Sequence, residues 1–104
     1  MILRIWHGYT TPENANAYEE TLRKEVFEEI KSKNIQGFKG MQLLRRMSAG
    51  EVEFMTIMTF ENIEAIKQFA GEQYEQAYIP DEARQVLSRF DDKAQHFELV
   101  LQLG

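Results

Sequence analysis

The sequence contains no cysteine among its 104 residues. This absence excludes disulfide scaffolds, thiol nucleophiles, iron–sulfur clusters and zinc sites built on cysteine. Proline is limited to Pro12 and Pro80, and no stretch has the composition of a linker. We therefore expect a single domain over residues 1–104, which is near the commonest domain length.

Positive charge and long apolar runs are also scarce. The chain has 12 Lys and Arg against 17 Asp and Glu, which gives a net charge of −5. Nucleic acids and anionic membrane surfaces require a basic surface on their partner, and a membrane helix needs roughly 18 consecutive apolar residues. The first residues are too charged for a signal peptide. We expect a cytoplasmic protein with neither a nucleic-acid partner nor a membrane partner.

Strand-like and helix-like patterns alternate along the chain. β-Prone apolar stretches predict strands, and apolar residues three or four positions apart predict helices. In chain order, the expected elements are a strand at 1–8, a helix from Pro12 to Asn34, strands at 38–47 and 52–60, a helix capped by Asn62 that is interrupted at Gly71 and continues over 72–78, a short helix over 80–87, and a strand at 94–103.

The order of these elements is β-α-β-β-α-β. This order predicts an α+β protein with the ferredoxin-like fold, in which a four-stranded antiparallel sheet carries both main helices on one face. The strands are nevertheless apolar on both faces: Phe54 and Met58 lie on one side of their strand, and Met55 and Ile57 on the other. Two helices cover only one face, so we predict a homodimer through the open face of the sheet.

Three segments are similar to a known family: Arg4–Gly8 (RIWHG), Thr59–Ile66 (TFENIEAI) and Gln95–Val100 (QHFELV). On these segments the chain resembles the antibiotic biosynthesis monooxygenase-like family of dimeric α+β barrel proteins, over nearly its whole length. Many members have Trp in place of Phe60 and Ser in place of Asn62. The resemblance implies the ferredoxin-like fold, but its superfamily includes monooxygenases, isomerases, haem degraders and regulators.

Two activities of this family can be compared residue by residue. Haem-degrading members use an Asn on the first strand and a Trp and a His on the second helix; these positions fall at His7, at Phe69 and at Tyr78 or Ile79, and none matches. Polyketide-oxidising members work without flavin, haem or metal, because the deprotonated aromatic substrate reacts directly with dioxygen. The resemblance therefore implies a cofactor-independent monooxygenase acting on an aromatic or polyketide-like small molecule. The alternatives are a non-catalytic ligand-binding or stress-related dimer and an isomerase or decarboxylating enzyme.

An oxygenase of this kind needs an apolar pocket for a flat ring and a base or hydrogen-bond donor. His96 and His7 are the candidate bases, and Arg4 is the candidate to stabilise a phenolate. The candidates to line the pocket, which would hold a small aromatic ligand and neither metal nor cofactor, are Trp6, Phe69, Tyr74, Tyr78 and Glu98.

Each candidate also has a purely structural interpretation. A strand pairing that places Arg4 opposite Glu98 predicts a cross-strand salt bridge between them. The same pairing puts His7 and His96 on opposite faces of the sheet, which argues against a metal site shared by the two histidines. Tyr74 and Tyr78, one helical turn apart beside Gly71 and Pro80, form either a mobile lid or ordinary packing.

Overall fold

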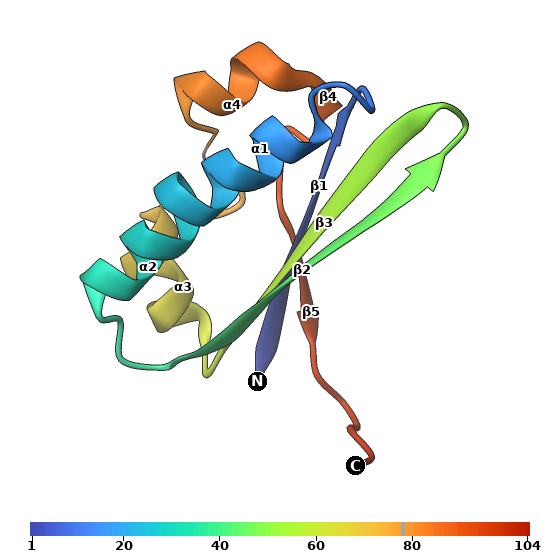
Figure 1. Ribbon diagram of the computed structural model, residues 1–104. Helices are drawn as coiled ribbons and strands as arrows, with labels where there is room; N and C mark the ends of the chain where they lie inside the picture. Colours follow the sequence, from blue (N-terminus) through green and yellow to red (C-terminus); the bar gives the residue numbers. More distant parts are fainter. Residues whose placement is uncertain (78) are drawn as a thin grey trace.

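The protein has two layers, one antiparallel sheet and a set of helices packed on it. The structure is a computed structural model that describes residues 1–77 and 79–104. The helices lie on one side of the sheet (Figure 1). The strands are β1 (Ile2–Thr10), β2 (Phe38–Ser48), β3 (Glu51–Phe60), β4 (Leu87–Phe90) and β5 (Gln95–Glu98); the helices are α1 (Ala15–Thr21), the π-helical η1 (Leu22–Phe27), α2 (Glu28–Lys33), α3 (Ile63–Ala70) and α4 (Asp81–Val86).

The strand order is β2-β3-β1-β4, and β5 also pairs with β1. All pairings are antiparallel, and β1 lies in the middle of the sheet. This order confirms the predicted ferredoxin-like α+β fold. None of the helices in the described part of the chain is long and apolar enough to cross a membrane.

The helix boundaries follow the predicted signals with one addition and two errors. The first helix begins at Ala15 and not at Pro12, because residues 12–14 form a turn before it. Asn34, in the left-handed conformation, ends the first helix, and the Asn62 side chain accepts a hydrogen bond from the Ala65 amide at 2.9 Å, as a helix cap does. The addition is the π-helical stretch η1. The predicted helix over 72–78 is wrong for residues 72–77, because Gly71, at φ +88°, ends α3 and a turn follows.

The predicted last strand over 94–103 is also wrong in its extent. The chain instead pairs with β1 through the two short strands β4 and β5. Between them, the Asp91 carboxylate accepts the His7 amide at 3.1 Å, in the position where a strand would offer a carbonyl. The Leu99 amide bonds to the Met1 carbonyl at 2.9 Å, and β1 has no residue left to pair beyond this point. The remaining residues form a tail that leads away from the sheet (Figure 1).

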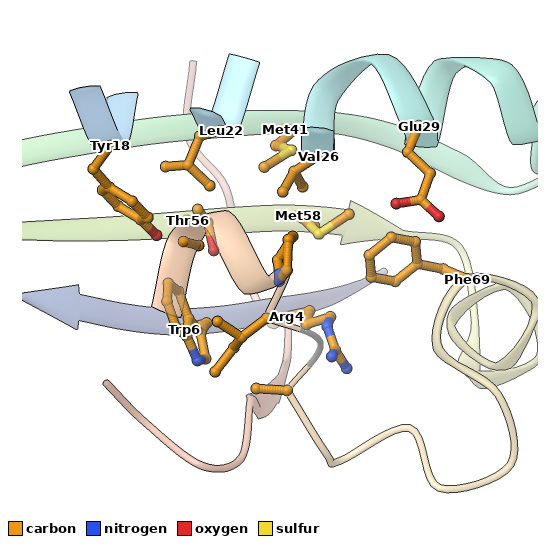
Figure 2. A pocket seen from close by; sticks show the side chains of 14 residues that line it. Arg4, Trp6, Tyr18, Leu22, Val26, Glu29, Met41, Thr56, Met58 and Phe69 are labelled. Carbon is orange, nitrogen blue, oxygen red and sulfur yellow. The ribbon is translucent and has the colours of Figure 1, made fainter. Parts of the chain in front are cut away.

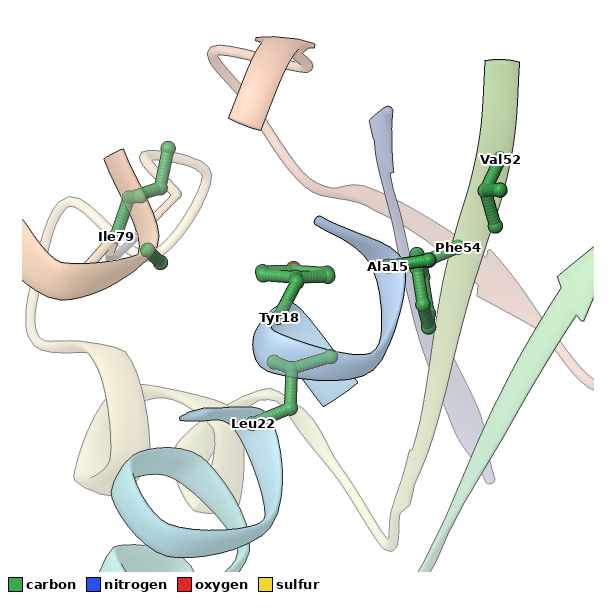
Figure 3. Packing of buried hydrophobic residues seen from close by; sticks show 7 residues of the cluster. Ala15, Tyr18, Leu22, Val52, Phe54 and Ile79 are labelled. Atoms are coloured by element: carbon green, nitrogen blue, oxygen red, sulfur yellow. The ribbon is translucent and has the colours of Figure 1, made fainter. Parts of the chain in front are cut away.

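The core lies between the sheet and the helices. Tyr18 of α1 packs edge-on against Phe54 of β3, with ring centroids 4.8 Å apart, and Leu22 lies beside them (Figure 3). A second cluster surrounds Phe60 and Ile66, both of which have no exposed surface. Burial of these residues holds the helices on one face only.

The opposite face of the sheet carries apolar side chains that no helix of the described residues covers. Ile5 and Ile57 lie opposite each other there, on β1 and β3, and both are half-buried by their neighbours alone. Phe97 of β5 and Leu44 of β2 keep 52% and 47% of their surface exposed on the same face. The apolar character predicted for both faces is therefore confirmed.

Gly8 of β1 lies under the indole ring of Trp6. A Cβ atom at Gly8 would come within 2.7 Å of the Trp6 ring, which is closer than real contacts allow. We expect Gly8→Ala to lower the free energy of unfolding by about 1–3 kcal/mol through this overpacking, and to change the emission of Trp6, the only tryptophan. Chemical denaturation followed by tryptophan fluorescence measures both effects; unchanged emission and stability would contradict this placement of Trp6.

Candidate functional site

A small cavity lies between the sheet and the helices, with a volume of about 60 Å³. Its floor is formed by Arg4 and Trp6 of β1 and by Thr56 and Met58 of β3, and Phe69 of α3 closes one end (Figure 2). The rest of the wall comes from the long helix formed by α1, η1 and α2, from β2, and from residues 77–83. These lining residues are Tyr18, Leu22, Val26, Glu29, Met41, Ala77, Ile79, Pro80 and Ala83.

Strand alternation explains why polar groups meet in an apolar cavity. Successive residues of a strand point to opposite faces, so Arg4 and Trp6 share the helix-covered face of β1. In the strand register Arg4 lies opposite Met58, and Trp6 lies opposite Thr56. Arg4 and Thr56 are the two polar residues that interrupt the otherwise apolar floor.

Arg4 is a buried charge, with 5% of its surface exposed. Its guanidinium donates to the main-chain carbonyls of Tyr74 and Gln76 and contacts His96 Nε2 at 3.0 Å, so its partners among the described residues include no carboxylate. It also lies 5.5 Å from the centroid of the Phe69 ring. Burial lowers the Arg4 pKa to about 10, which still leaves the side chain protonated at neutral pH. Arg4 thus contributes a positive charge to the cavity floor, with no carboxylate among its described hydrogen-bond partners.

The register of β5 corrects the predicted partner of Arg4. Arg4 lies opposite His96, and Glu98 lies opposite Ile2 with its side chain exposed. The predicted salt bridge between Arg4 and Glu98 is therefore wrong, and Glu98 does not line the cavity. The true register differs from the predicted one by two residues, which keeps every side chain on its predicted face.

His96 contacts the Arg4 guanidinium but does not itself line the cavity. An arginine can only donate hydrogen bonds, so the His96 Nε2 atom accepts and the proton of the neutral ring resides on Nδ1. Burial lowers the His96 pKa, and the charge of Arg4 lowers it further, while nearby Glu75 opposes the shift. The imidazole therefore stays neutral and orients the guanidinium.

The His96 shift predicts how stability depends on pH. The unfolded chain takes up a proton on this histidine near pH 6.5, whereas the folded protein resists that proton. The contribution of neutral His96 to the free energy of unfolding is therefore fully present above this pH, and it decreases as the pH falls through and below 6.5. We expect His96→Gln, which keeps an acceptor for Arg4, to flatten this fall in urea denaturation at several pH values. An equally steep fall in the variant would contradict the assignment.

His7 occupies the other face of the sheet, as the predicted side-chain parity requires. Its Nδ1 atom lies 2.9 Å from Asp91 Oδ2, and its Nε2 atom lies 3.9 Å from Glu53 Oε2. The cavity lies on the opposite side of β1, so the structure does not bring His7 together with Arg4. Trp6, by contrast, lines the cavity and donates its indole N–H to the Asp91 carbonyl at 2.7 Å.

Neither of the two tyrosines predicted to line the pocket is among the described lining residues. Tyr74 lies in the turn after α3, outside the cavity, with its ring edge-on to His96 at 5.2 Å. Tyr78 lies outside the described residues. Phe69 does line the cavity, and Lys33 Nζ lies 5.2 Å from its ring centroid.

Three polar cavity residues were not among the predicted site residues: Tyr18, Thr56 and Glu29. Burial raises the Tyr18 pKa, so its hydroxyl stays protonated and can donate a hydrogen bond into the cavity. Thr56 carried a sequence signal, because it interrupts the apolar face set by Phe54 and Met58. Glu29 carried none, since its spacing also fits an exposed helix pair with Lys33, which the structure shows at 3.8 Å.

The polar groups of the cavity are few and are set in apolar surroundings. Within residues 1–77 and 79–104, no three His, Cys, Asp or Glu side chains are grouped so as to hold a metal ion. What the cavity offers is apolar surface, the Arg4 cation, the Tyr18 and Thr56 hydroxyls and the Glu29 carboxylate. These groups suit a flat apolar molecule with one ionisable oxygen.

Comparison with known proteins identifies the fold. No protein-family model matches the sequence, and no curated protein matches it. Solved structures match over nearly the whole chain. A proposed antibiotic biosynthesis monooxygenase from Bacillus cereus has a TM-score of 0.69 at 13% identity, covering 99% of this chain and 94% of that one.

Two further structures match at similar coverage. A point mutant of MhuD with two manganese protoporphyrin IX molecules per active site has a TM-score of 0.68 at 21% identity, covering 100% of this chain and 99% of that one. SnoaB, a cofactor-independent oxygenase from Streptomyces nogalater, has a TM-score of 0.58 at 16% identity, covering 98% and 96%. The chain has the fold of the antibiotic biosynthesis monooxygenase-like proteins.

Proteins of this fold include MhuD, a haem degrader from Mycobacterium tuberculosis. The described lining of this chain's cavity contains neither histidine nor cysteine to serve as the axial ligand of a haem.

Proposed function

We propose that the protein binds a small aromatic molecule with an ionisable oxygen between the sheet and the helices, and oxygenates it without a cofactor. One observation carries the proposal: Arg4 is a buried cation at the floor of an apolar cavity, and none of its described partners is an anion. A buried charge without a counter-ion is costly to the fold, and an anionic oxygen of a ligand would offset that cost. The expectation of a cytoplasmic location stands beside this proposal.

The cavity residues have distinct roles in this chemistry. Trp6 and Phe69 would contact the aromatic ring, and Arg4 would stabilise its ionised oxygen. Glu29 is the one carboxylate in the described lining, and we assign it the role of proton acceptor. His96 contacts Arg4 instead of the cavity, so it acts as a positioning residue and not as the base.

The oxidation needs no external reductant if the substrate supplies the electrons. Loss of a proton from a methylene group activated by the aromatic system gives a carbanion, whose charge is shared with the oxygen at Arg4. The carbanion transfers electrons to dioxygen. One oxygen atom then enters the substrate as a carbonyl, and the other leaves as water with the two methylene hydrogens. SnoaB, which shares this fold, is a cofactor-independent oxygenase.

The proposal includes a homodimer formed by the open face of the sheet. Its support is the apolar surface of Ile5, Ile57, Leu44 and Phe97, which no other layer of the described residues covers. Two sheets that pack face to face bury such side chains from both partners. A two-fold axis makes the contact self-complementary, so one copy suffices as the partner.

A second candidate function is ligand binding without chemistry. Two observations favour it: neither histidine lines the cavity, and the cavity is smaller than the 150 Å³ or so that holds a benzene. In this case Arg4 would still bind the anionic oxygen. The site would lack only the proton transfer.

Oxygen consumption with anthrone as the substrate distinguishes the two candidates. We expect one dioxygen per anthrone, and a loss of about 100-fold in kcat/KM on Glu29→Gln, the size expected for a lost proton acceptor. Glu28→Gln, which removes the neighbouring exposed carboxylate, is the matched control and should leave the rate unchanged. Binding of anthrone without oxygen consumption would instead establish the second candidate.

A further inference from the structure

The segment of residues 72–77 forms part of the cavity wall and is held there by Arg4. Ala77 lines the cavity beside Ile79. The Arg4 guanidinium donates to the main-chain carbonyls of Tyr74 and Gln76, at the middle of the segment. The Arg4 guanidinium, which gives the cavity its positive charge, is thus also the group that holds the 72–77 segment against the cavity.

Few other long-range hydrogen bonds hold the 72–77 segment. The Ala77 amide donates to the Asp92 carbonyl at 3.0 Å, and the Glu75 carbonyl accepts from the Ala94 amide at 2.8 Å. Outside these pairings the segment is largely exposed. Segments with few buried contacts and exposed backbone open at low free energy.

Gly71 gives the segment a hinge where it leaves α3. Its φ of +88° is one that other residues rarely adopt, and a Cβ atom built there meets nothing within 4 Å. The backbone can therefore rotate at this position without a clash. A rotation here would carry residues 72–77 away from the floor of the cavity.

The size of the cavity requires such a movement. A volume of about 60 Å³ is less than half of the 150 Å³ or so that accommodates a benzene. An aromatic ring can enter only if a wall moves. The core around Tyr18 and Phe54 fixes the sheet and the long helix. Ala77 is the one residue of the 72–77 segment that packs against this core, so the segment is the most weakly held of the walls.

An anionic oxygen competes directly for the donors that hold this wall. Hydrogen bonds from a guanidinium to a carboxylate or phenolate are roughly twice as strong as those to a neutral carbonyl, and they can be bidentate. The N–H groups of Arg4 that point at Tyr74 and Gln76 are on two different nitrogens, as bidentate binding requires. His96 would continue to orient the guanidinium during the exchange.

We propose that Arg4 is a ligand-operated latch: it keeps the 72–77 segment closed in the empty protein, and the anionic oxygen of an aromatic ligand releases the segment by taking over its hydrogen bonds. This inference rests on the proposed function, because it assumes that the ligand binds at Arg4. The latch goes beyond the proposed function because it determines which aromatic molecules the site binds. Aromatic molecules of the same shape that cannot form an anionic oxygen do not release the latch, so the site selects aromatic carboxylates, phenolates and molecules that ionise to a phenolate or enolate.

The latch predicts that removing one side chain near the site tightens ligand binding. Tyr74 stabilises the closed segment through its edge-on contact with His96 and does not line the cavity. Tyr74→Ala should therefore shift the population towards the open form and tighten ligand binding. In titration calorimetry with naphthoate, we expect the dissociation constant to decrease by about 3- to 10-fold, the size of one aromatic contact. A weaker or unchanged affinity would overturn the latch.

Hydrogen exchange gives a second, independent readout. In the wild-type protein, saturating naphthoate should speed exchange at the amides of Ala77 and Ala94 at least about tenfold, and naphthamide should not. Arg4→Lys, whose single ammonium cannot reach both carbonyls, should speed exchange at the same amides without any ligand. The amides of β3 serve as the internal control and should stay unchanged.

The outcomes separate the latch from the proposed function. Naphthoate binding with unchanged or slower exchange at Ala77 and Ala94 would overturn the latch and leave the binding site intact. No binding of naphthoate to either the wild-type protein or Tyr74→Ala would overturn both. Faster exchange at these amides together with tighter binding to Tyr74→Ala is the result that the latch predicts.

Discussion

Replacing Ile57 by glutamate is expected to convert the protein from a dimer into a monomer. Ile57 lies at the middle of the open face, opposite Ile5 in the strand register. In a face-to-face dimer the two-fold axis would bury one new carboxylate from each subunit in apolar surroundings. The effective penalty is several kcal/mol for each ion, so the dimer dissociation constant should rise by at least about 1000-fold.

Sedimentation equilibrium over a range of concentrations measures this change. Because Ile57 is only half-buried within one chain, the variant should keep the circular dichroism of the wild-type protein. Gln68→Glu adds the same charge at an exposed position of α3 and should remain dimeric. A wild-type protein that is monomeric at micromolar concentration, or a variant that still dimerises, would show that the open face is not the interface.

Replacing Arg4 by methionine is expected to abolish binding of aromatic anions. Truncating one partner of a buried, hydrogen-bonded charge pair costs about 2–5 kcal/mol, so naphthoate affinity should fall by at least about 30-fold. Methionine keeps the length and the apolar contacts of the side chain. The small affinity expected for naphthamide should be unaffected by the substitution, and naphthamide is therefore the ligand control.

The same variant should be at least as stable as the wild-type protein when no ligand is present. Burial lowers the Arg4 pKa from its ordinary value to about 10, so holding the charged form in the fold at neutral pH costs about 3 kcal/mol. The folded state regains this free energy only as the pH rises above about 10, where the folded protein gives up this proton and the unfolded chain still holds it. Removing the charge removes the cost, and water can reach the Gln76 carbonyl on its exposed segment. A clear loss of thermal stability would show that Arg4 is structural.

The order of strands and helices was predictable because each element carries its own periodic pattern. The two faces of β1 and β3 were predictable for the same reason, and so was the placement of His7 and His96 on opposite sides. A register error of two residues leaves these assignments intact. It does change the cross-strand partner, which is why Arg4 meets His96 and not Glu98.

The 72–77 segment could not be predicted from local patterns. Its Glu and Gln residues favour a helix, and the sequence continues the helical spacing of α3 after Gly71. The structure is decided instead by contacts distant in sequence: Gln76 forms a bridge with Lys93, and Arg4 takes the carbonyls of Tyr74 and Gln76. The same limitation applies to Glu29, whose place on the cavity wall depends on how the helix lies across the sheet.

A crystal structure of the protein with naphthoate is the measurement that tests the central claim most directly. We predict density for the naphthyl ring between Trp6 and Phe69, with its carboxylate on Arg4 and the Tyr74 and Gln76 carbonyls moved away from the guanidinium. The same crystal should contain a two-fold dimer through the open face. Naphthoate bound elsewhere, with Arg4 still hydrogen-bonded to both carbonyls and the cavity closed, would contradict the claim that this cavity is the ligand site.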